Sequence, residues 1–176
     1  IRDALNAYEI PYTEAADYAF RNLYYQLIRE EIKLPGNNKF LMPGVGPLLK
    51  ILSQRDDIYL GLLTGNWETS GRIKISHFGI DHYFPFGAFA DDSEIRDELL
   101  PFAIQRFEKK YGKTASPEQI YVIGDTPADI HCARPHKAFS VAVGAAKYSA
   151  AELSAHNPDF LFEDLSDIER VLNVLG

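Results

Sequence analysis

Residues 120–130 constrain the fold of this chain more than any other segment, because an apolar run ends there in a glycine and two spaced carboxylates follow. Residues 121–123 are β-branched and aromatic and lie between turn signals, which predicts a buried strand. Gly124 permits a turn at the end of that strand, and Thr126 followed by Pro127 is typical of a helix start. The sequence therefore predicts a strand–turn–helix unit.

Two carboxylates, Asp125 and Asp129, belong to this turn and to the first turn of the predicted helix. Open α/β sheets bind ligands at the carboxyl ends of their strands, and hard oxygen ligands at such a place suit Mg²⁺. A structural interpretation competes with this one: Asp125 would then be a turn former, and Asp129 an acid that favours a helix start. The local sequence leaves both interpretations open.

Helical and strand-like patterns alternate along the chain from residue 45 onward. Strands that are separated by helices favour a parallel sheet with helices on both faces, so the predicted class is α/β. Helices are expected at residues 45–54, 69–78, 96–111, 127–133, 150–155 and 166–175, and strands at residues 58–63, 83–90, 121–123, 140–143 and 160–162.

The first 34 residues have a different character, because they are helical in pattern and rich in tyrosine and phenylalanine. Thr13 marks a helix start, and residues 35–38 break the chain before a linker. We expect the aromatic side chains, and Trp67, to pack in the protein rather than to line a substrate entrance. The predicted organisation is a helical portion with its linker at residues 1–40 and an α/β core at residues 41–176.

The composition is that of a globular protein, with 46% apolar and 24% charged residues. A net charge of −7 argues against nucleic acid as a partner, since phosphate backbones bind clustered cations. No apolar run approaches membrane-spanning length, so no membrane partner is expected. The single cysteine, Cys132, has no partner for an internal disulfide, which favours a cytoplasmic location. No feature indicates an oligomeric state.

A second strand end, at residues 63–66, offers a hydroxyl and backbone N–H groups beside a helix start, which together are typical of an anion site. In a parallel sheet this end meets the edge that carries the two carboxylates, and an anion site beside a metal site indicates phosphate chemistry. Arg96 is a candidate cation for the same edge. Taken alone, Thr64 is explained as a helix cap, and Arg96 as a surface partner of Asp92 or Glu94.

Four segments in one order, residues 62–66, 79–84, 91–99 and 124–130, resemble those of haloacid dehalogenase superfamily hydrolases of the phosphoglycolate-phosphatase-like group. The resemblance implies a Rossmann-like, three-layer parallel sheet with part of a helical cap at the N-terminus. It also implies a Mg²⁺-dependent phosphatase that acts on a small phosphorylated metabolite through an aspartyl-phosphate intermediate.

The same resemblance implies roles for individual residues. Thr64 would hydrogen-bond the phosphoryl oxygens, helped by the N–H groups of Gly65 and Asn66. Arg96 stands where the family usually has lysine and would neutralise phosphoryl charge, so Thr64 and Arg96 are the candidate catalytic residues.

For the metal, Asp125 would bind Mg²⁺, and Asp129 would be a further ligand or would orient Arg96. The family's nucleophile lies in an Asp-x-Asp-x-Thr motif at the end of its first, central strand, and no Asp-x-Asp occurs in these 176 residues. We therefore expect the nucleophile upstream of Ile1, and this chain to be inactive alone. The alternatives are a non-catalytic phosphate-binding pseudo-phosphatase, or the same fold with dehalogenase or phosphosugar mutase activity. Dehalogenation needs no metal, so the paired carboxylates disfavour it.

Overall fold

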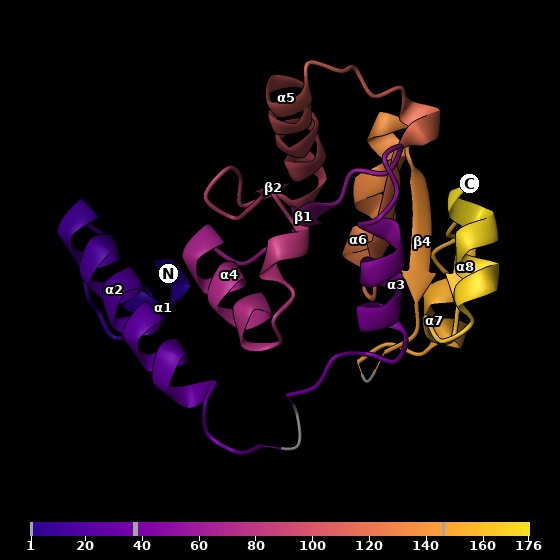
Figure 1. Cartoon of the computed structure of the whole chain (residues 1–176). Coiled ribbons are helices and arrows are strands. Elements are labelled where there is room, and N and C mark those ends of the chain that lie inside the picture. Colours follow the sequence, from indigo (N-terminus) through magenta and orange to yellow (C-terminus); the bar gives the residue numbers. More distant parts are fainter. Residues whose placement is uncertain (1, 37–38, 146) are drawn as a thin grey trace.

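The computed structural model describes residues 2–36, 39–145 and 147–176 (Figure 1). The helices are α1 (Arg2–Ala7), α2 (Glu14–Glu31), α3 (Val45–Leu52), α4 (Glu68–His77), α5 (Leu99–Tyr111), α6 (Pro127–Ala133), α7 (Ala150–Ser154) and α8 (Ile168–Leu175). The strands are β1 (Gly61–Leu63), β2 (Phe86–Ala88), β3 (Tyr121–Gly124), β4 (Phe139–Val143) and β5 (Phe160–Phe162). None of the described helices is both long and apolar enough to cross a membrane.

All paired strands are parallel, which confirms the predicted α/β class. They form two sheets, one of order β1-β2 and one of order β3-β4-β5. The first two strands are shorter than expected, with residues 61–63 and 86–88 in place of 58–63 and 83–90. Within the described ranges these two strands pair only with each other, so only the residues that face one another join the ladder. Residues 81–83 form a 3₁₀ turn.

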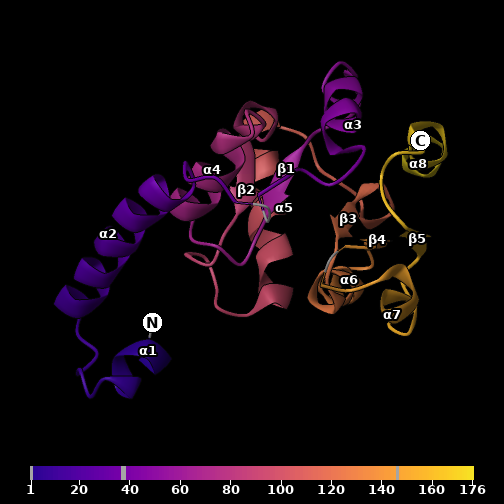
Figure 2. The same ribbon diagram turned by 90° about the horizontal axis from the view of Figure 1, so that it is seen from below.

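Helices cover both faces of the β3-β4-β5 sheet (Figure 2). On one face, α3 and α8 pack on β4 and β5 through a cluster of buried apolar side chains, among them Leu48, Val141 and Val171. On the other face, Ile130 of α6 and Leu153 of α7 pack against β4. The strand–turn–helix unit predicted from residues 120–130 is therefore β3 followed by α6, with the expected layered packing around it.

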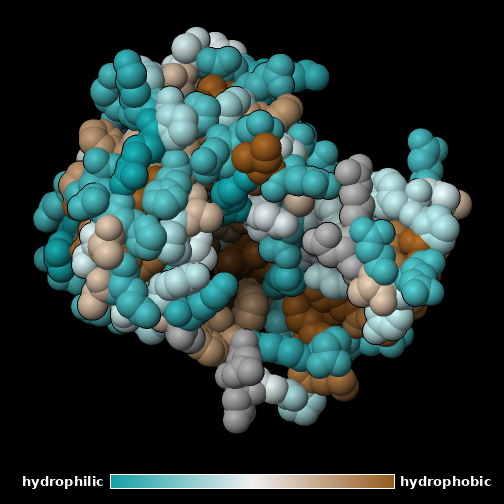
Figure 3. Space-filling model, turned by 180° about the vertical axis from the view of Figure 1, so that it is seen from behind, coloured by the Kyte–Doolittle hydropathy of each residue, from teal (hydrophilic) through white to brown (hydrophobic). Residues whose placement is uncertain are grey.

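No backbone hydrogen bond joins the two sheets in the described part of the chain. Among the described residues, β1 pairs only with β2, and β3 pairs only with β4. The side chain of Ile123 in β3 is 39% exposed, although its sequence pattern is that of a buried strand. Figure 3 shows a hollow with a hydrophobic floor near the middle of the molecule seen from behind. The inner sides of β1 and β3 are thus left without a described partner strand.

Helix α2 lies beside α4, away from the β3-β4-β5 sheet (Figures 1 and 2). The Thr13 hydroxyl caps α2 by accepting a hydrogen bond from the N–H of Ala16, as the sequence predicts. Tyr24 and Tyr25 pack edge-on against Trp67, at ring-centroid distances of 5.6 and 6.1 Å. No residue of α2 is fully buried, because this helix is covered on only one side. The predicted break at residues 35–38 lies partly outside the described residues.

Gly44 provides a test of the junction between α3 and the loop that leads to α8. Its φ is 83°, and a Cβ atom there would lie 1.8 Å from the carbonyl oxygen of Leu165. We expect Gly44→Ala to lower the free energy of unfolding by roughly 2 kcal/mol or more, because the backbone strain adds to the clash.

The matched control is Gly46→Ala, since Gly46 lies in α3 and a Cβ there would meet no atom within 4 Å other than those of its chain neighbours and its own helix backbone. Removing a helical glycine should raise stability by about 0.5–1 kcal/mol. Urea denaturation of the purified variants measures both changes. Equal stabilities for the two variants would contradict the packing described for this junction.

Candidate functional site

Thr64 follows β1 directly and continues its ladder, because its N–H donates to the carbonyl oxygen of Ala88 at 3.1 Å. Its Oγ1 accepts two hydrogen bonds from Asn66, one from the backbone N at 3.1 Å and one from Nδ2 at 2.8 Å. A hydroxyl has two acceptor positions and one proton to donate, so the proton of Thr64 is left for another partner. Thr64 does not cap α4, since the N-cap residue of that helix is Trp67.

The backbone around Thr64 offers fewer donors than the sequence suggests. The N–H of Asn66, expected to face an anion, is engaged by Thr64 Oγ1. The N–H of Gly65 donates to no residue in the described part of the chain, and Gly65 is exposed. The donors that remain for an anion are therefore the Thr64 hydroxyl and the Gly65 N–H.

Arg96 connects the two sheets. It opens the 3₁₀ turn Arg96–Glu98 between β2 and α5, where the sequence predicted the first turn of a helix. Its Nη2 donates to the carbonyl oxygen of Leu63 at 3.1 Å and also forms an ion pair with Asp129 Oδ1. The guanidinium thus spans from the end of β1 to the start of α6. The alternative partners weighed for it, Asp92 and Glu94, do not pair with it.

The backbone of Arg96 is also held in place. The thiol of Cys132, fully buried in α6, donates to the carbonyl oxygen of Arg96 at 3.2 Å. Burial raises the pKa of this thiol above its ordinary value, so it stays protonated and can act as this donor. Cys132 is thus a packed thiol.

Asp129 is 5% exposed, and both of its carboxylate oxygens are occupied. Oδ1 receives Arg96, while Oδ2 accepts from the N and Oγ1 of Thr126 at 3.1 and 2.8 Å. A Cβ on Gly124 would lie 2.2 Å from Asp129 Cγ, so the carboxylate fits only against a glycine. Of the two roles implied by the resemblance, orientation of Arg96 is the one that this geometry supports.

Asp125 directly follows Gly124, the last residue of β3, and it is exposed. It makes no hydrogen bond or ion pair with any described residue, which leaves its carboxylate open to a ligand. No cluster of three or more His, Cys, Asp or Glu side chains that could hold a metal occurs in the described ranges. Mg²⁺ is commonly held by one or two carboxylates, waters and substrate phosphates, so Asp125, with Asp129 beside it, fits that mode of binding.

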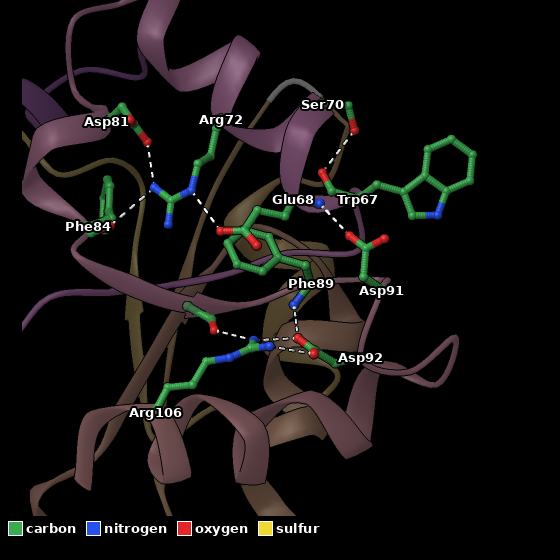
Figure 4. Close-up of polar contacts among 11 residues, drawn as sticks. Trp67, Glu68, Ser70, Arg72, Asp81, Phe84, Phe89, Asp91, Asp92 and Arg106 are labelled. Carbon is green, nitrogen blue, oxygen red and sulfur yellow. Dashed lines mark hydrogen bonds and ion pairs between the residues drawn. The ribbon is translucent and has the colours of Figure 1, made fainter. Parts of the chain in front are cut away.

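The loop that leads to Arg96 is fixed by Asp92 (Figure 4). Arg106 of α5 binds this carboxylate through two nitrogens, with Nη1–Oδ2 and Nη2–Oδ1 distances of 2.6 and 2.7 Å. The N–H of Phe89 adds a third hydrogen bond, at 2.9 Å. Burial alone would raise the pKa of Asp92, but the hydrogen bonds from Arg106 and Phe89 and the charge of Arg106 lower it below its ordinary value.

Asp91, the preceding residue, connects this loop to two helices. Its Oδ2 accepts from the N–H of Glu68, in the first turn of α4, at 2.6 Å (Figure 4). Its Oδ1 pairs with Arg21 of α2 at 2.8 Å, and the Arg21 guanidinium lies 4.5 Å from the centroid of the Trp67 ring. These contacts hold α2 against the start of α4 through Asp91, Arg21 and Trp67. Trp67 is therefore half-buried in this contact.

One member of the site was missed at the sequence level. Lys74, two turns into α4, donates from Nζ to Asn66 Oδ1 at 2.6 Å. Burial lowers the pKa of Lys74 below its ordinary value. The only sequence signal for it is a lysine on the helix that follows the loop, and such a residue is usually solvated.

A family model identifies the family of this chain. The profile of the haloacid dehalogenase-like hydrolases matches residues 4–136, and the chain belongs to this hydrolase family. The parallel strands and the helices that cover them are those of a Rossmann-like haloacid dehalogenase core. A comparison with curated protein sequences gave no match.

Solved structures agree on the fold. A predicted phosphoglycolate phosphatase from Haemophilus somnus is similar with a TM-score of 0.68 and 23% identity, over 98% of this chain and 73% of that one. A haloacid dehalogenase-like family protein from Streptococcus pneumoniae has a TM-score of 0.64 and 21% identity, over 75% of this chain and 60% of that one. A β-phosphoglucomutase from Clostridium difficile has a TM-score of 0.64 and 21% identity, over 87% and 62%. This chain thus spans less than two thirds of the last two proteins.

The Asp92 contact predicts a pH-dependent stability. Asp92→Asn should lower the free energy of unfolding at pH 7 by about 2 kcal/mol, because it removes a charged acceptor from Arg106. Since the folded-state pKa of Asp92 lies below its unfolded value, the stabilisation is present at neutral pH and is lost as the pH falls through the folded-state value. The deficit of the variant should therefore shrink below about pH 4.

Urea denaturation at pH 7 and at stepwise lower pH tests this expectation. Asp56→Asn is the control, because Asp56 is an exposed loop residue and should show little change at any pH. A deficit for Asp92→Asn that stays constant from pH 7 to pH 3 would mean that the charge of Asp92 is not the cause.

Proposed function

We propose that this chain is the larger part of a Mg²⁺-dependent phosphatase that hydrolyses a small phosphomonoester through an aspartyl-phosphate. The observation that carries the proposal is the position of Arg96, whose guanidinium joins the Thr64 end of β1 to Asp129. A cation, an anion cradle and two carboxylates thus lie beyond the carboxyl ends of β1 and β3. This combination suits a phosphoryl group with a bound divalent metal.

Thr64, Gly65 and Arg96 would bind the phosphoryl oxygens. The Thr64 hydroxyl and the Gly65 N–H supply two donors that no other described group uses. Nη1 of Arg96 lies 4.0 Å from the position of a Cβ on Gly65, so the guanidinium faces the same cradle. Since Asp129 holds Nη2, the cation is fixed before a substrate arrives, and little reorganisation is needed as charge develops.

Asp125 would hold the metal, with Asp129 beside it. When bound, Mg²⁺ would supply positive charge for the phosphoryl oxygens at this edge. The exposed carboxylate of Asp125 suits a site that is completed by water and by the substrate itself. Asp129 would act mainly on Arg96, because both of its oxygens are already engaged.

The nucleophile would come from a parallel strand outside these residues, which would pair between β1 and β3. Three observations support this position for the strand: the unpaired inner sides of β1 and β3, the exposure of Ile123, and the hydrophobic hollow (Figure 3). The carboxyl end of such a strand would lie beside Thr64 and Asp125. Its aspartate would attack phosphorus and displace the ester oxygen, which would take a proton from a second aspartate two residues later. The same aspartate would then accept a proton from the water that hydrolyses the acyl phosphate, which releases inorganic phosphate and restores the nucleophile.

A non-catalytic phosphate-binding protein is the second candidate, since no Asp-x-Asp motif occurs in the 176 residues. It keeps the Thr64 cradle and Arg96, and it would bind phosphate without turning over an ester. The expected ligand of both candidates is a small phosphorylated metabolite.

The location that we propose is the cytoplasm. The single cysteine of the chain, Cys132, is a buried free thiol, which favours a reducing compartment.

Phosphatase activity of the full-length protein tests the proposal. We expect hydrolysis of at least one ester from a panel of small phosphomonoesters with Mg²⁺, and loss of it with EDTA. Asp125→Asn should lower kcat/KM by about 100-fold or more, because the metal loses its protein ligand. Phosphate release measures each rate.

Asp56→Asn is again the matched control, because Asp56 precedes β1 and so lies toward the opposite edge of that sheet. Its activity should equal that of the parent. A rate of hydrolysis that changes neither on removal of Mg²⁺ nor in the Asp125→Asn variant would refute the proposal. Binding of inorganic phosphate without hydrolysis of any ester would favour the second candidate.

A further inference from the structure

A chain of three side chains leads from α4 to the anion cradle. Lys74 Nζ donates to Asn66 Oδ1 at 2.6 Å, and Asn66 Nδ2 donates to Thr64 Oγ1 at 2.8 Å. Lys74 is half-buried and makes no ion pair with any described carboxylate, so Asn66 is its polar partner in this structure. Lys74 therefore contacts the candidate site indirectly, through the side-chain amide of Asn66.

The chemistry of the three groups fixes the direction of each hydrogen bond. A lysine ammonium has donors only, so the amide of Asn66 must turn its oxygen toward Lys74. The NH₂ of the same amide must then face Thr64, which can only accept from it. With its two acceptor positions filled by Asn66 Nδ2 and the Asn66 backbone N–H, the Thr64 hydroxyl has only its proton left to offer.

Without the ammonium, the amide of Asn66 has two orientations of similar energy. In the reversed orientation its oxygen faces Thr64 and attracts the hydroxyl proton. The hydroxyl would then be satisfied within the protein and would have to break that bond before it could donate to an anion. Lys74 thus determines whether the hydroxyl proton of Thr64 is free to donate to an anion in the cradle.

We propose that Lys74 is a positioning residue that, through Asn66, directs the hydroxyl proton of Thr64 toward a bound phosphoryl oxygen. This inference rests on the proposed function for the identity of the anion. The hydrogen-bond chain itself exists in the free protein, so it can be tested with and without catalysis.

The kinetic test is a double-mutant cycle in the full-length protein, with p-nitrophenyl phosphate and Mg²⁺. Thr64→Val should lower kcat/KM about 100-fold, as expected for the loss of one oxyanion donor. Lys74→Met should lower it about 10-fold, the equivalent of one ordinary hydrogen bond. In the Thr64→Val background, Lys74→Met should cause no further loss, because there is no hydroxyl left to direct.

Lys74→Arg keeps a donor-only cation and should recover most of the activity lost in Lys74→Met. Lys50→Met is the control, since Lys50 is an exposed lysine of α3 and should keep full activity. Losses for Lys74→Met and Thr64→Val that multiply in the double variant would overturn the proposal and leave the proposed function intact.

The second measurement does not depend on activity. In ¹⁵N spectra, the side-chain NH₂ of Asn66 should give two well-resolved proton signals in the parent protein and in Lys74→Arg. In Lys74→Met these signals should shift and exchange with water several-fold faster. Unchanged signals would overturn the proposal whatever the activity. Changed signals in a protein that hydrolyses no ester would support the orientation by Lys74 and refute only the phosphatase function.

Discussion

The ion pair between Arg96 and Asp129 is the interaction on which the site depends. The β1-β2 and β3-β4-β5 sheets share no backbone hydrogen bonds in the described residues, and this pair, together with the bond from Arg96 to Leu63, joins their carboxyl ends. Because Asp129 is buried, removing Arg96 would leave an uncompensated carboxylate, which is strongly destabilising. Stability and the proposed chemistry thus share one contact.

The position of Arg96 is set from both sides. Asp92 and Arg106 fix the loop before it, and the thiol of Cys132 holds its own carbonyl group. Asp91, next to Asp92, reaches Arg21 on α2 and the start of α4. Contacts thus run from α2, through Asp91, to the loop that leads to Arg96 in the candidate site.

The sequence predicted the fold well because its signals were local. Apolar runs that end in Gly-Asp or Thr-Gly, followed by helical periodicity, are sufficient to place β3, α6 and the end of β1. The same patterns indicate Thr64 and Asp125 as candidate site residues, because each directly follows an apolar run that ends a strand. The predicted lengths of β1 and β2 were wrong, because the length of a strand depends on the neighbouring strand with which it pairs. The sequence of the strand itself does not indicate which strand that is.

The detailed hydrogen bonding of the site was beyond sequence reasoning. Whether the Asn66 N–H faces an anion or Thr64 depends on the conformation of the loop, which the residue types alone do not determine. Lys74 was missed for the same reason, since an isolated lysine in a helix is usually solvated. Asp129 was left with two roles, and only the engagement of both its oxygens distinguishes them.

Detection of a phosphorylated intermediate tests the central claim most directly. Full-length protein mixed rapidly with a phosphomonoester and quenched in acid should show, by intact mass spectrometry, the addition of one phosphoryl group only when Mg²⁺ is present. The adduct should map by peptide analysis to an aspartate outside residues 1–176, and Asp125→Asn should abolish it. An adduct on a residue of this chain, or one that forms equally well without Mg²⁺, would contradict the account.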